Sequence, residues 1–336
     1  MRCHLNHEHI LGDGILTMDF TLDCGQTLAD TKVAYRLTGR PDGPLVVVQG
    51  GISAGRQVCR LTDDEAHGWW EDFVGQQKVV DTDHYLILSI DYLGGEGQTR
   101  CRVDRQHSGG ALPTITTVDQ ANLIRRVVEY LGVPVVAGFI GASYGGMVAL
   151  SYGALFPSDV AKLIVISAAD RPHPMATGWR SIQRNIVRLG LDTNRVDIAL
   201  SLARSLAMTT YRTAEEFDAR FDGPAEALAS GFRFPIEGYL EHHGQRFSEK
   251  FRPESFICLS ESIDLHRVDV SRITAPMTVI GVRSDRLVPV WQLDGMAKLA
   301  GGDCTLHVVE SVYGHDAFLK EQTTIGTLVT GALRCA

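Results

Sequence analysis

The segment FIGASYGGMVAL, residues 139–150, places Ser143 between Gly141 and Gly145, where one apolar run ends and another begins. Small residues gather wherever a strand turns tightly into a helix, so this G-x-S-x-G pattern also arises by chance. It indicates a nucleophile only if a strand precedes it, a helix follows it and partner residues occupy later loops. The surrounding sequence therefore decides what Ser143 does.

Short β-branched runs recur along the chain, and each ends in Gly, Ser or Asp. They are PLVVVQGG (44–51), HYLILSIDYLGG (84–95), VPVVAGFIGAS (133–143), VAKLIVISAA (160–169), APMTVIGVRSD (275–285) and CTLHVVES (304–311). Nearly continuous apolar strands are typical of a parallel sheet buried on both faces. Helical periodicity appears between them, for example over 116–133, where Gly132 provides a stop. The alternation predicts a mostly parallel, doubly wound α/β sheet.

Ser143 falls between a predicted strand over 135–140 and a predicted helix over 144–156, which is the setting of a nucleophile elbow. In an α/β hydrolase the acid and the histidine follow later strands, in the order Ser, Asp, His. Asp285 follows MTVIGV, and His315 lies in the loop after TLHVVE. We therefore expect Ser143 to be the nucleophile, His315 its base and Asp285 the residue that orients the imidazole.

The predicted oxyanion hole uses two backbone N–H groups. One belongs to Tyr144, the residue after the nucleophile, and the other to the loop of VVVQGGIS, where Gly50 and Gly51 both allow close approach of a substrate. The choice between these two glycines stays open. A competing phosphate loop, LGGEGQT (93–99), lacks the G-K-[ST] ending and is set aside.

Composition sets outer bounds. The chain has 336 residues, 44% hydrophobic and 21% charged, with a net charge of −8. No Lys/Arg cluster favours nucleic acid or an anionic membrane, and no run of about 20 apolar residues predicts a membrane span. The start of the sequence lacks the apolar core of a signal peptide, so we expect a cytoplasmic protein.

Cysteine and histidine usage gives no metal motif. Seven scattered cysteines are most simply free thiols. Cys3, His4, His7 and His9 lie together, but a cluster at a chain end is more often a solvated tail. We therefore expect no bound metal and no bound cofactor.

Several longer segments carry a family resemblance. GWWEDFVGQQKVVDTDHYLILSIDYLGG (68–95), GASYGGMVAL (141–150), SDRLVP (284–289) and YGHDAF (313–318) resemble the core motifs of the homoserine O-acyltransferases of the MetX type. TTYRTAEEFDARFDG (209–223), IEGYLEHHGQRF (236–247) and FRPESFICLSESIDLHRVD (251–269) are similar to that family's lid region. The resemblance extends from about residue 30 to 325.

The resemblance implies an α/β-hydrolase fold and acyl transfer from an acyl-coenzyme A to the side-chain hydroxyl of L-homoserine, in methionine biosynthesis. It implies a ping-pong reaction in which the acyl group passes through Ser143, with acyl-CoA as a co-substrate. By position Arg212 matches the residue that holds the acceptor's carboxylate and Asp316 the residue that meets its ammonium. Tyr239 is a weaker match and Arg220 a reserve candidate. A homodimer through lid helices is also implied. From the spacing we expect a core over 1–171 and 271–336, with a helical lid over 172–270.

The sequence departs from the family in three places. Tyr144 stands where the family usually has Met, QGGISAG replaces Ala-Leu-Thr-Gly, and AADRPHPMATGWRSIQR (168–184) differs at the start of the lid. Acetyl and succinyl donors, and homoserine and serine acceptors, therefore stay open, with a slight preference for acetyl. A succinyl donor would need a cation, for which the candidates are Arg56, Arg60 and Arg180.

Two other functions compete with this reading. A serine hydrolase would use the same fold and triad, and only its acceptor would differ. A non-catalytic relative would normally have lost a triad member, and the sequence retains all three.

Overall fold

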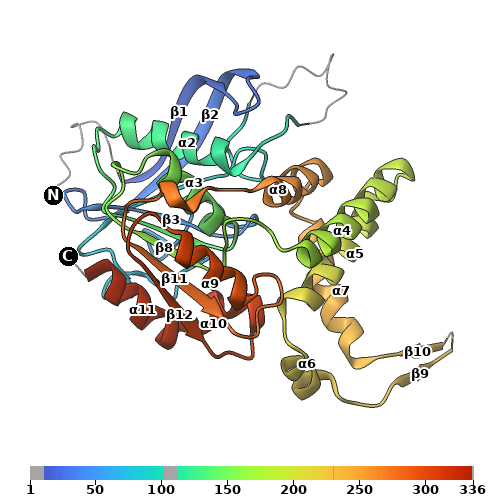
Figure 1. The fold of residues 1–336 in the computed structure, drawn as a ribbon. Coiled ribbons are helices and arrows are strands. Elements are labelled where there is room, and N and C mark those ends of the chain that lie inside the picture. Colours follow the sequence, from blue (N-terminus) through green and yellow to red (C-terminus); the bar gives the residue numbers. More distant parts are fainter. Residues whose placement is uncertain (1–10, 102–111, 230, 335–336) are drawn as a thin grey trace.

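A computed structural model describes residues 11–101, 112–229 and 231–334. An eight-stranded sheet lies at its centre, in the order β1-β2-β6-β3-β7-β8-β11-β12 (Figure 1). The strands are β1 (Gly12–Thr21), β2 (Thr27–Gly39), β3 (Leu45–Gln49), β6 (Leu86–Ile90), β7 (Gly138–Ala142), β8 (Leu163–Ile166), β11 (Met277–Val282) and β12 (Cys304–Val309). The six strands from β6 to β12 run parallel, as the apolar runs predict. The α/β-hydrolase fold class is confirmed.

Both faces of the parallel strands are buried, because successive side chains point to opposite faces. Val47 and Phe139 pack on one face with helices α2 (Thr117–Tyr130), α3 (Tyr144–Leu155) and α9 (Val290–Leu299). Val46 and Ile140 pack on the other with α10 (Ala317–Lys320) and α11 (Gln322–Arg334). Because both faces are buried, the sequences of these strands are continuously apolar.

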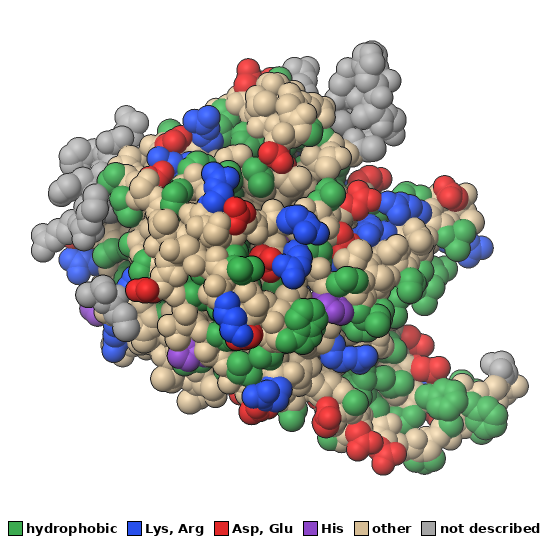
Figure 2. Space-filling model, in the orientation of Figure 1, with side chains coloured by type: hydrophobic (Ala, Val, Ile, Leu, Met, Phe, Trp, Pro, Cys, Tyr) green, Lys and Arg blue, Asp and Glu red, His purple; other side chains and the backbone are tan. Residues whose placement is uncertain are grey.

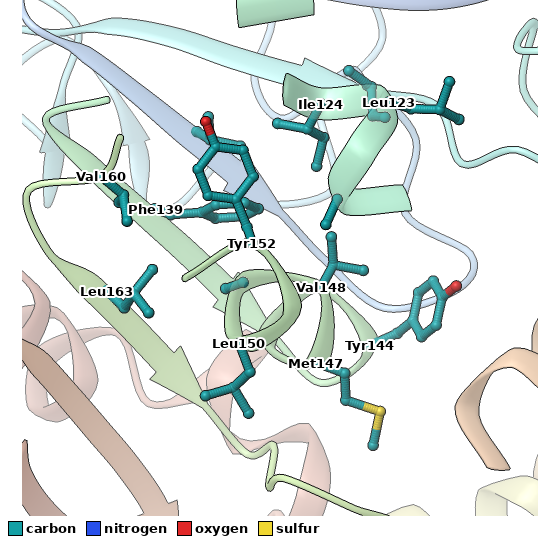
Figure 3. Close-up of a cluster of buried hydrophobic side chains, with 14 of the residues drawn as sticks. Leu123, Ile124, Phe139, Tyr144, Met147, Val148, Leu150, Tyr152, Val160 and Leu163 are labelled. Carbon is teal, nitrogen blue, oxygen red and sulfur yellow. The ribbon is translucent and has the colours of Figure 1, made fainter. Parts of the chain in front are cut away.

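Helix α3 is buried on nearly all sides. Only small and apolar residues, with Ser151, occupy its twelve positions, and a helix that is hydrophobic all round belongs in a protein interior. Tyr152 meets Phe139 edge to face, with ring centroids 5.4 Å apart (Figure 3). Tyr144 contacts Tyr92 in the same way at 4.9 Å. The elbow that precedes α3 is therefore fixed to a rigid element.

Strands β1 and β2 are absent from the sequence-based prediction. They pair antiparallel with one another, and β2 pairs antiparallel with β6. Side chains of β1 alternate between partly buried and exposed, so its sequence GDGILTMDFT contains no continuous apolar run. An edge strand exposed on one face gives this weaker pattern.

The segment between β8 and β11 is mostly helical. It contains α4 (Pro174–Asp192), α5 (Val196–Tyr211), α6 (Ala214–Phe221), the short strands β9 (Glu226–Leu228) and β10 (Gly231–Arg233), α7 (Pro235–Ser248) and α8 (Pro253–Leu265). α4, α5 and α7 pack together and stand away from the sheet, on the right of Figure 1. Their own core includes Val187, Leu200 and Phe247. We call this segment the lid.

The lid begins directly beyond the carboxyl end of β8, next to the end of β7, so it lies over the elbow. In the part of the chain that the structure describes, no helix is long and apolar enough to cross a membrane.

Candidate active site

Ser143 occupies a strained turn between β7 and α3. Its φ is 55° and its ψ is −119°, a backbone region that side chains rarely adopt. A Cβ on Gly141 would lie 2.1 Å from the Gly145 carbonyl oxygen, and a Cβ on Gly145 would lie 2.1 Å from the Gln49 carbonyl oxygen. The two glycines are therefore required by close backbone contacts, and the turn presents the Ser143 side chain outward.

His315 and Asp285 reach Ser143 from the ends of two other strands. His315 Nε2 lies 2.8 Å from Ser143 Oγ, and His315 Nδ1 lies 2.7 Å from Asp285 Oδ2. Asp285 follows β11, and His315 lies in a 3₁₀ turn, η2 (Gly314–Asp316), after β12. The structure thus brings together the three predicted residues in the geometry of a nucleophile, a base and an orienting acid.

The Asp285 carboxylate is held on both oxygens. Its Oδ1 accepts the backbone N–H groups of Leu287, at 2.8 Å, and Val288, at 3.1 Å. Burial is the largest single effect and opposes protonation of His315, but the carboxylates of Asp285 and Asp316 together raise the pKa of His315 above its usual value. An imidazole with a raised pKa is a stronger proton acceptor for Ser143.

The loop after β3 lies against the elbow. The Gly145 N–H donates to the Gly50 carbonyl at 2.9 Å, and the Tyr92 hydroxyl donates to the same oxygen at 2.7 Å. Gly51 lines the cavity above Ser143, whereas Gly50 is not among the described residues that line it. The backbone N–H groups of Tyr144 and Gly51 are thus better placed for an oxyanion than that of Gly50.

A cavity of about 230 Å³ lies between the elbow and the lid and includes Ser143 and His315 in its wall. One face of α4 forms much of that wall, through Ala176, Trp179, Arg180 and Gln183, which follow helical i, i+3, i+4, i+7 spacing.

Two arginines of α4 share one carboxylate beside the cavity. Arg180 lies 2.6 Å from Asp264 Oδ1, and Arg184 lies 2.6 Å from Asp264 Oδ2. Neither arginine has a second carboxylate within ion-pair distance in the described part of the chain, so one positive charge there is uncompensated. Of this pair, Arg180 lines the cavity.

Arg56 and Arg60, the other two cations considered for a succinyl donor, are used elsewhere. Arg56 pairs with buried Asp91 at 2.5 Å and with Asp13 at 2.9 Å. Arg60 lies 3.4 Å from Glu71. Neither is among the described residues that line the cavity, so the structure gives them no part in this site.

Arg212 is enclosed by carboxylates. Its Nε lies 3.0 Å from Asp316 Oδ2 and its Nη1 lies 3.2 Å from Glu216, which also pairs with Arg220 at 2.9 Å. Asp316 lines the cavity, but Arg212 is not among the described lining residues. Burial raises the pKa of Asp316 although Arg212 opposes this. The sequence predicts that Arg212 binds a substrate carboxylate. In the structure Arg212 pairs instead with two carboxylates of the protein, and of Arg212 and Asp316 it is Asp316 that lines the cavity.

Tyr239 also lies behind the cavity wall. Its ring packs against Phe217, with centroids 6.0 Å apart, and the Arg220 guanidinium lies 4.7 Å from its ring centre. It is not among the described residues that line the cavity.

Two arginines that line the cavity are not among the site residues predicted from the sequence. Arg171 precedes α4 and pairs with Asp170 at 2.5 Å. Arg204 of α5 lies 5.4 Å from the Tyr211 ring centre and 5.2 Å from that of Phe247, and among the described residues it makes no ion pair. Only helical spacing relative to Tyr211, i to i+7, could have pointed to it.

The described residues contain no group of three His, Cys, Asp or Glu side chains placed to hold a metal ion. The cluster of Cys3, His4, His7 and His9 lies outside the described residues.

Comparison with known proteins identifies the family of this chain. The sequence matches the alpha/beta hydrolase fold family over residues 43–322, so the class of protein is an α/β hydrolase. A homoserine O-succinyltransferase of Xanthomonas campestris is 36% identical over 305 residues, covering 91% of this chain and 79% of that protein. A homoserine O-acetyltransferase of Mycolicibacterium smegmatis is 30% identical, covering 94% and 91%. The chain belongs to the homoserine O-acyltransferase family, which confirms the resemblance.

The solved structure of a homoserine O-acetyltransferase from Bacillus anthracis superimposes with a TM-score of 0.85 at 18% identity, covering 96% of this chain and 97% of that one. At this identity the likeness concerns the fold alone.

Proposed function

We propose that this enzyme transfers an acyl group from acyl-CoA to the side-chain hydroxyl of L-homoserine, in methionine biosynthesis, through an acyl-enzyme on Ser143. The observation that carries the proposal is the Ser143–His315–Asp285 chain of hydrogen bonds at the wall of a cavity beneath the lid. A covered cavity favours transfer to a bound acceptor over hydrolysis, because it limits the access of water.

In the first half-reaction, Ser143 Oγ attacks the thioester carbonyl while His315 Nε2 takes its proton. The backbone N–H groups of Tyr144 and Gly51 stabilise the oxyanion. The C–S bond then breaks, and the imidazolium returns the proton to the leaving thiolate of coenzyme A.

In the second half-reaction, the homoserine hydroxyl gives its proton to His315 and attacks the Ser143 ester. The C–O bond to Ser143 breaks, and Ser143 recovers the proton. Asp316 at the cavity wall meets the acceptor's ammonium, and Arg212 fixes the orientation of Asp316. Arg204, which faces the cavity without an ion pair among the described residues, is the candidate for the acceptor's carboxylate.

For the donor we propose succinyl-CoA, in place of the slight preference for acetyl that the sequence suggested. The support is Arg180, which lines the cavity and shares the single carboxylate of Asp264 with Arg184, so that one positive charge is uncompensated among the described residues. Arg171, which pairs with Asp170, adds a second cation to the cavity wall. A free carboxylate on the acyl group needs such a cation because burying an unpaired charge is costly. The 36% identical relative named for succinyl transfer agrees with this choice.

Release of coenzyme A, followed with a thiol reagent, tests these proposals. Release should be slow with succinyl-CoA alone and rise strongly on addition of L-homoserine, with parallel lines in double-reciprocal plots. Acetyl-CoA and L-serine provide the comparison arms. Fast release of coenzyme A that does not change on addition of any amino acid would show that the protein is a hydrolase. Intact mass should show the succinyl adduct in wild type and none in Ser143→Ala.

We also propose a homodimer, formed through the lid, in the cytoplasm. Exposed apolar side chains of α4 and α5 support the dimer, and Figure 2 shows hydrophobic side chains gathered on the projecting lid. They are Ile182, Leu189, Ile198 and Leu202. Light scattering coupled to size-exclusion chromatography should give twice the chain mass, and Leu202→Glu should give the monomer. Cell fractionation tests the location.

A further inference from the structure

Ser167 is the structural counterpart of the nucleophile on the neighbouring strand. β7 and β8 run parallel with Ala142 opposite Ile166, so Ser143 and Ser167 are the first residues beyond the two strands. Both have positive φ, 55° and 49°. The other described non-glycine residues with positive φ, Asp30, Gln77 and Asn194, are exposed. Ser167 therefore combines backbone strain with a place beside the reacting group.

The side chain of Ser167 is buried and lines the cavity. Its exposed fraction is 1%, and its hydroxyl has no hydrogen-bond partner in the part of the chain that the structure describes. A buried hydroxyl without a partner destabilises the fold, and so does a non-glycine residue at positive φ. Strain of this kind persists at ligand-binding positions, where a bound molecule supplies the missing partner.

The cavity that Ser167 lines also contains groups suited to an anion. Arg180 and Gln183 of α4 line the same cavity, and Gln183 is itself 4% exposed. Adjacent strands lie about 4.8 Å apart. The first and fourth carbons of an extended succinyl chain are separated by roughly 4 Å, given C–C bonds of about 1.5 Å. A succinyl group on Ser143 can thus place its free carboxylate over the end of β8.

We propose that Ser167 is a specificity-determining residue that donates its hydroxyl hydrogen to the free carboxylate of the succinyl group, beside Arg180. The inference rests on the proposed succinyl donor. An acetyl group has no free carboxylate to accept this hydrogen, so Ser167 contributes to the use of one donor only.

Two variants separate the hydroxyl from the strain. Ser167→Ala removes the hydroxyl and keeps a side chain at positive φ, whereas Ser167→Gly removes the hydroxyl and relieves the strain. In single-turnover acylation at low donor concentration, both should react with succinyl-CoA about 10-fold to 100-fold more slowly than wild type. Acylation by acetyl-CoA should keep its wild-type rate. Ser158→Ala, at an exposed serine, is the matched control and should change neither rate.

An unchanged rate with succinyl-CoA in both variants would overturn the proposal, as would an equal loss with both donors, which indicates damage to the elbow. A loss in Ser167→Ala that Ser167→Gly restores would assign the effect to backbone strain and also overturn it. If wild type is acylated by acetyl-CoA alone, the donor proposal itself fails, and that result is visible without any variant.

Discussion

Replacing Asp285 with Asn should disable the enzyme through the tautomer of His315. Oδ1 of Asp285 accepts two backbone N–H groups, from Leu287 and Val288, while Oδ2 faces His315 Nδ1. In Asp285→Asn the amide oxygen must take the Oδ1 position, because an NH₂ group there would confront two donors. The NH₂ group then points at Nδ1, which must become an acceptor, and the proton moves to Nε2.

A proton on Nε2 removes the acceptor that Ser143 needs. Ser143 Oγ lies 2.8 Å from Nε2, so the Ser143 O–H could no longer donate its hydrogen to this nitrogen. The corresponding change in a serine protease lowers kcat about 10⁴-fold, equal to about 5.5 kcal/mol of activation free energy. We expect a loss of that order in acylation. The two backbone hydrogen bonds survive, so the stability of the fold should change little.

Single-turnover release of coenzyme A, with wild type and Asp285→Asn at the same pH, measures the effect. Asp294→Asn, at an exposed carboxylate paired with Lys298, is the matched control and should retain the full rate. A loss smaller than about tenfold in a folded Asp285→Asn protein would refute the tautomer argument, since tenfold corresponds to only 1.36 kcal/mol.

Other residues give further expectations. The acylation rate should rise with pH through an apparent pKa above about 6.5, because Asp285 raises the pKa of His315 and only the neutral imidazole accepts a proton; a midpoint below 6.5 would contradict this. Gly145→Ala places a Cβ 2.1 Å from the Gln49 carbonyl oxygen, and should lower the free energy of unfolding in urea by at least about 1–3 kcal/mol. Arg56→Met removes the guanidinium that pairs with Asp91, whose side chain is 3% exposed, and should cost about 3–5 kcal/mol in the same measurement. Tyr144→Phe breaks the 2.7 Å bond to Ser262, and should cost about 1 kcal/mol while sparing acylation, since the backbone N–H remains.

The core of the fold could be predicted because its signals are local. A strand buried on both faces must be continuously apolar, and the elbow must carry glycine at Gly141 and Gly145, where any side chain would collide with backbone. The chain order Ser143, Asp285, His315 follows from the order of strands in the sheet. Each of these constraints produces a sequence pattern that can be recognised within a few residues.

The edge of the sheet and the lid produce weaker sequence patterns. β1 alternates between partly buried and exposed positions among glycines and acids, so composition alone does not distinguish it from a loop. The partner of Arg212 depends on tertiary packing that brings Asp316, about a hundred positions away in the chain, to within 3.0 Å. Arg204 and Ser167 gain their meaning from a cavity that exists only when α4 and α5 cover the elbow.

The core and the lid should control different properties of the reaction: the core its rate, and the lid its preference between donors. Ser143, Asp285 and His315 follow the ends of sheet strands, and in the proposed mechanism they act on the thioester group that every acyl-CoA donor shares. Arg180 and Gln183 lie on α4, a helix of the lid, and line the cavity, where we propose that the tail of the acyl group binds. Substitutions on the strand ends should therefore change the rate with all donors together, whereas substitutions along the cavity face of α4 should change the ratio between donors. Ser167 lies where the core meets the lid, because it follows a sheet strand and lines the cavity proposed for the acyl tail. Its two variants therefore test most directly whether rate and donor preference are controlled separately.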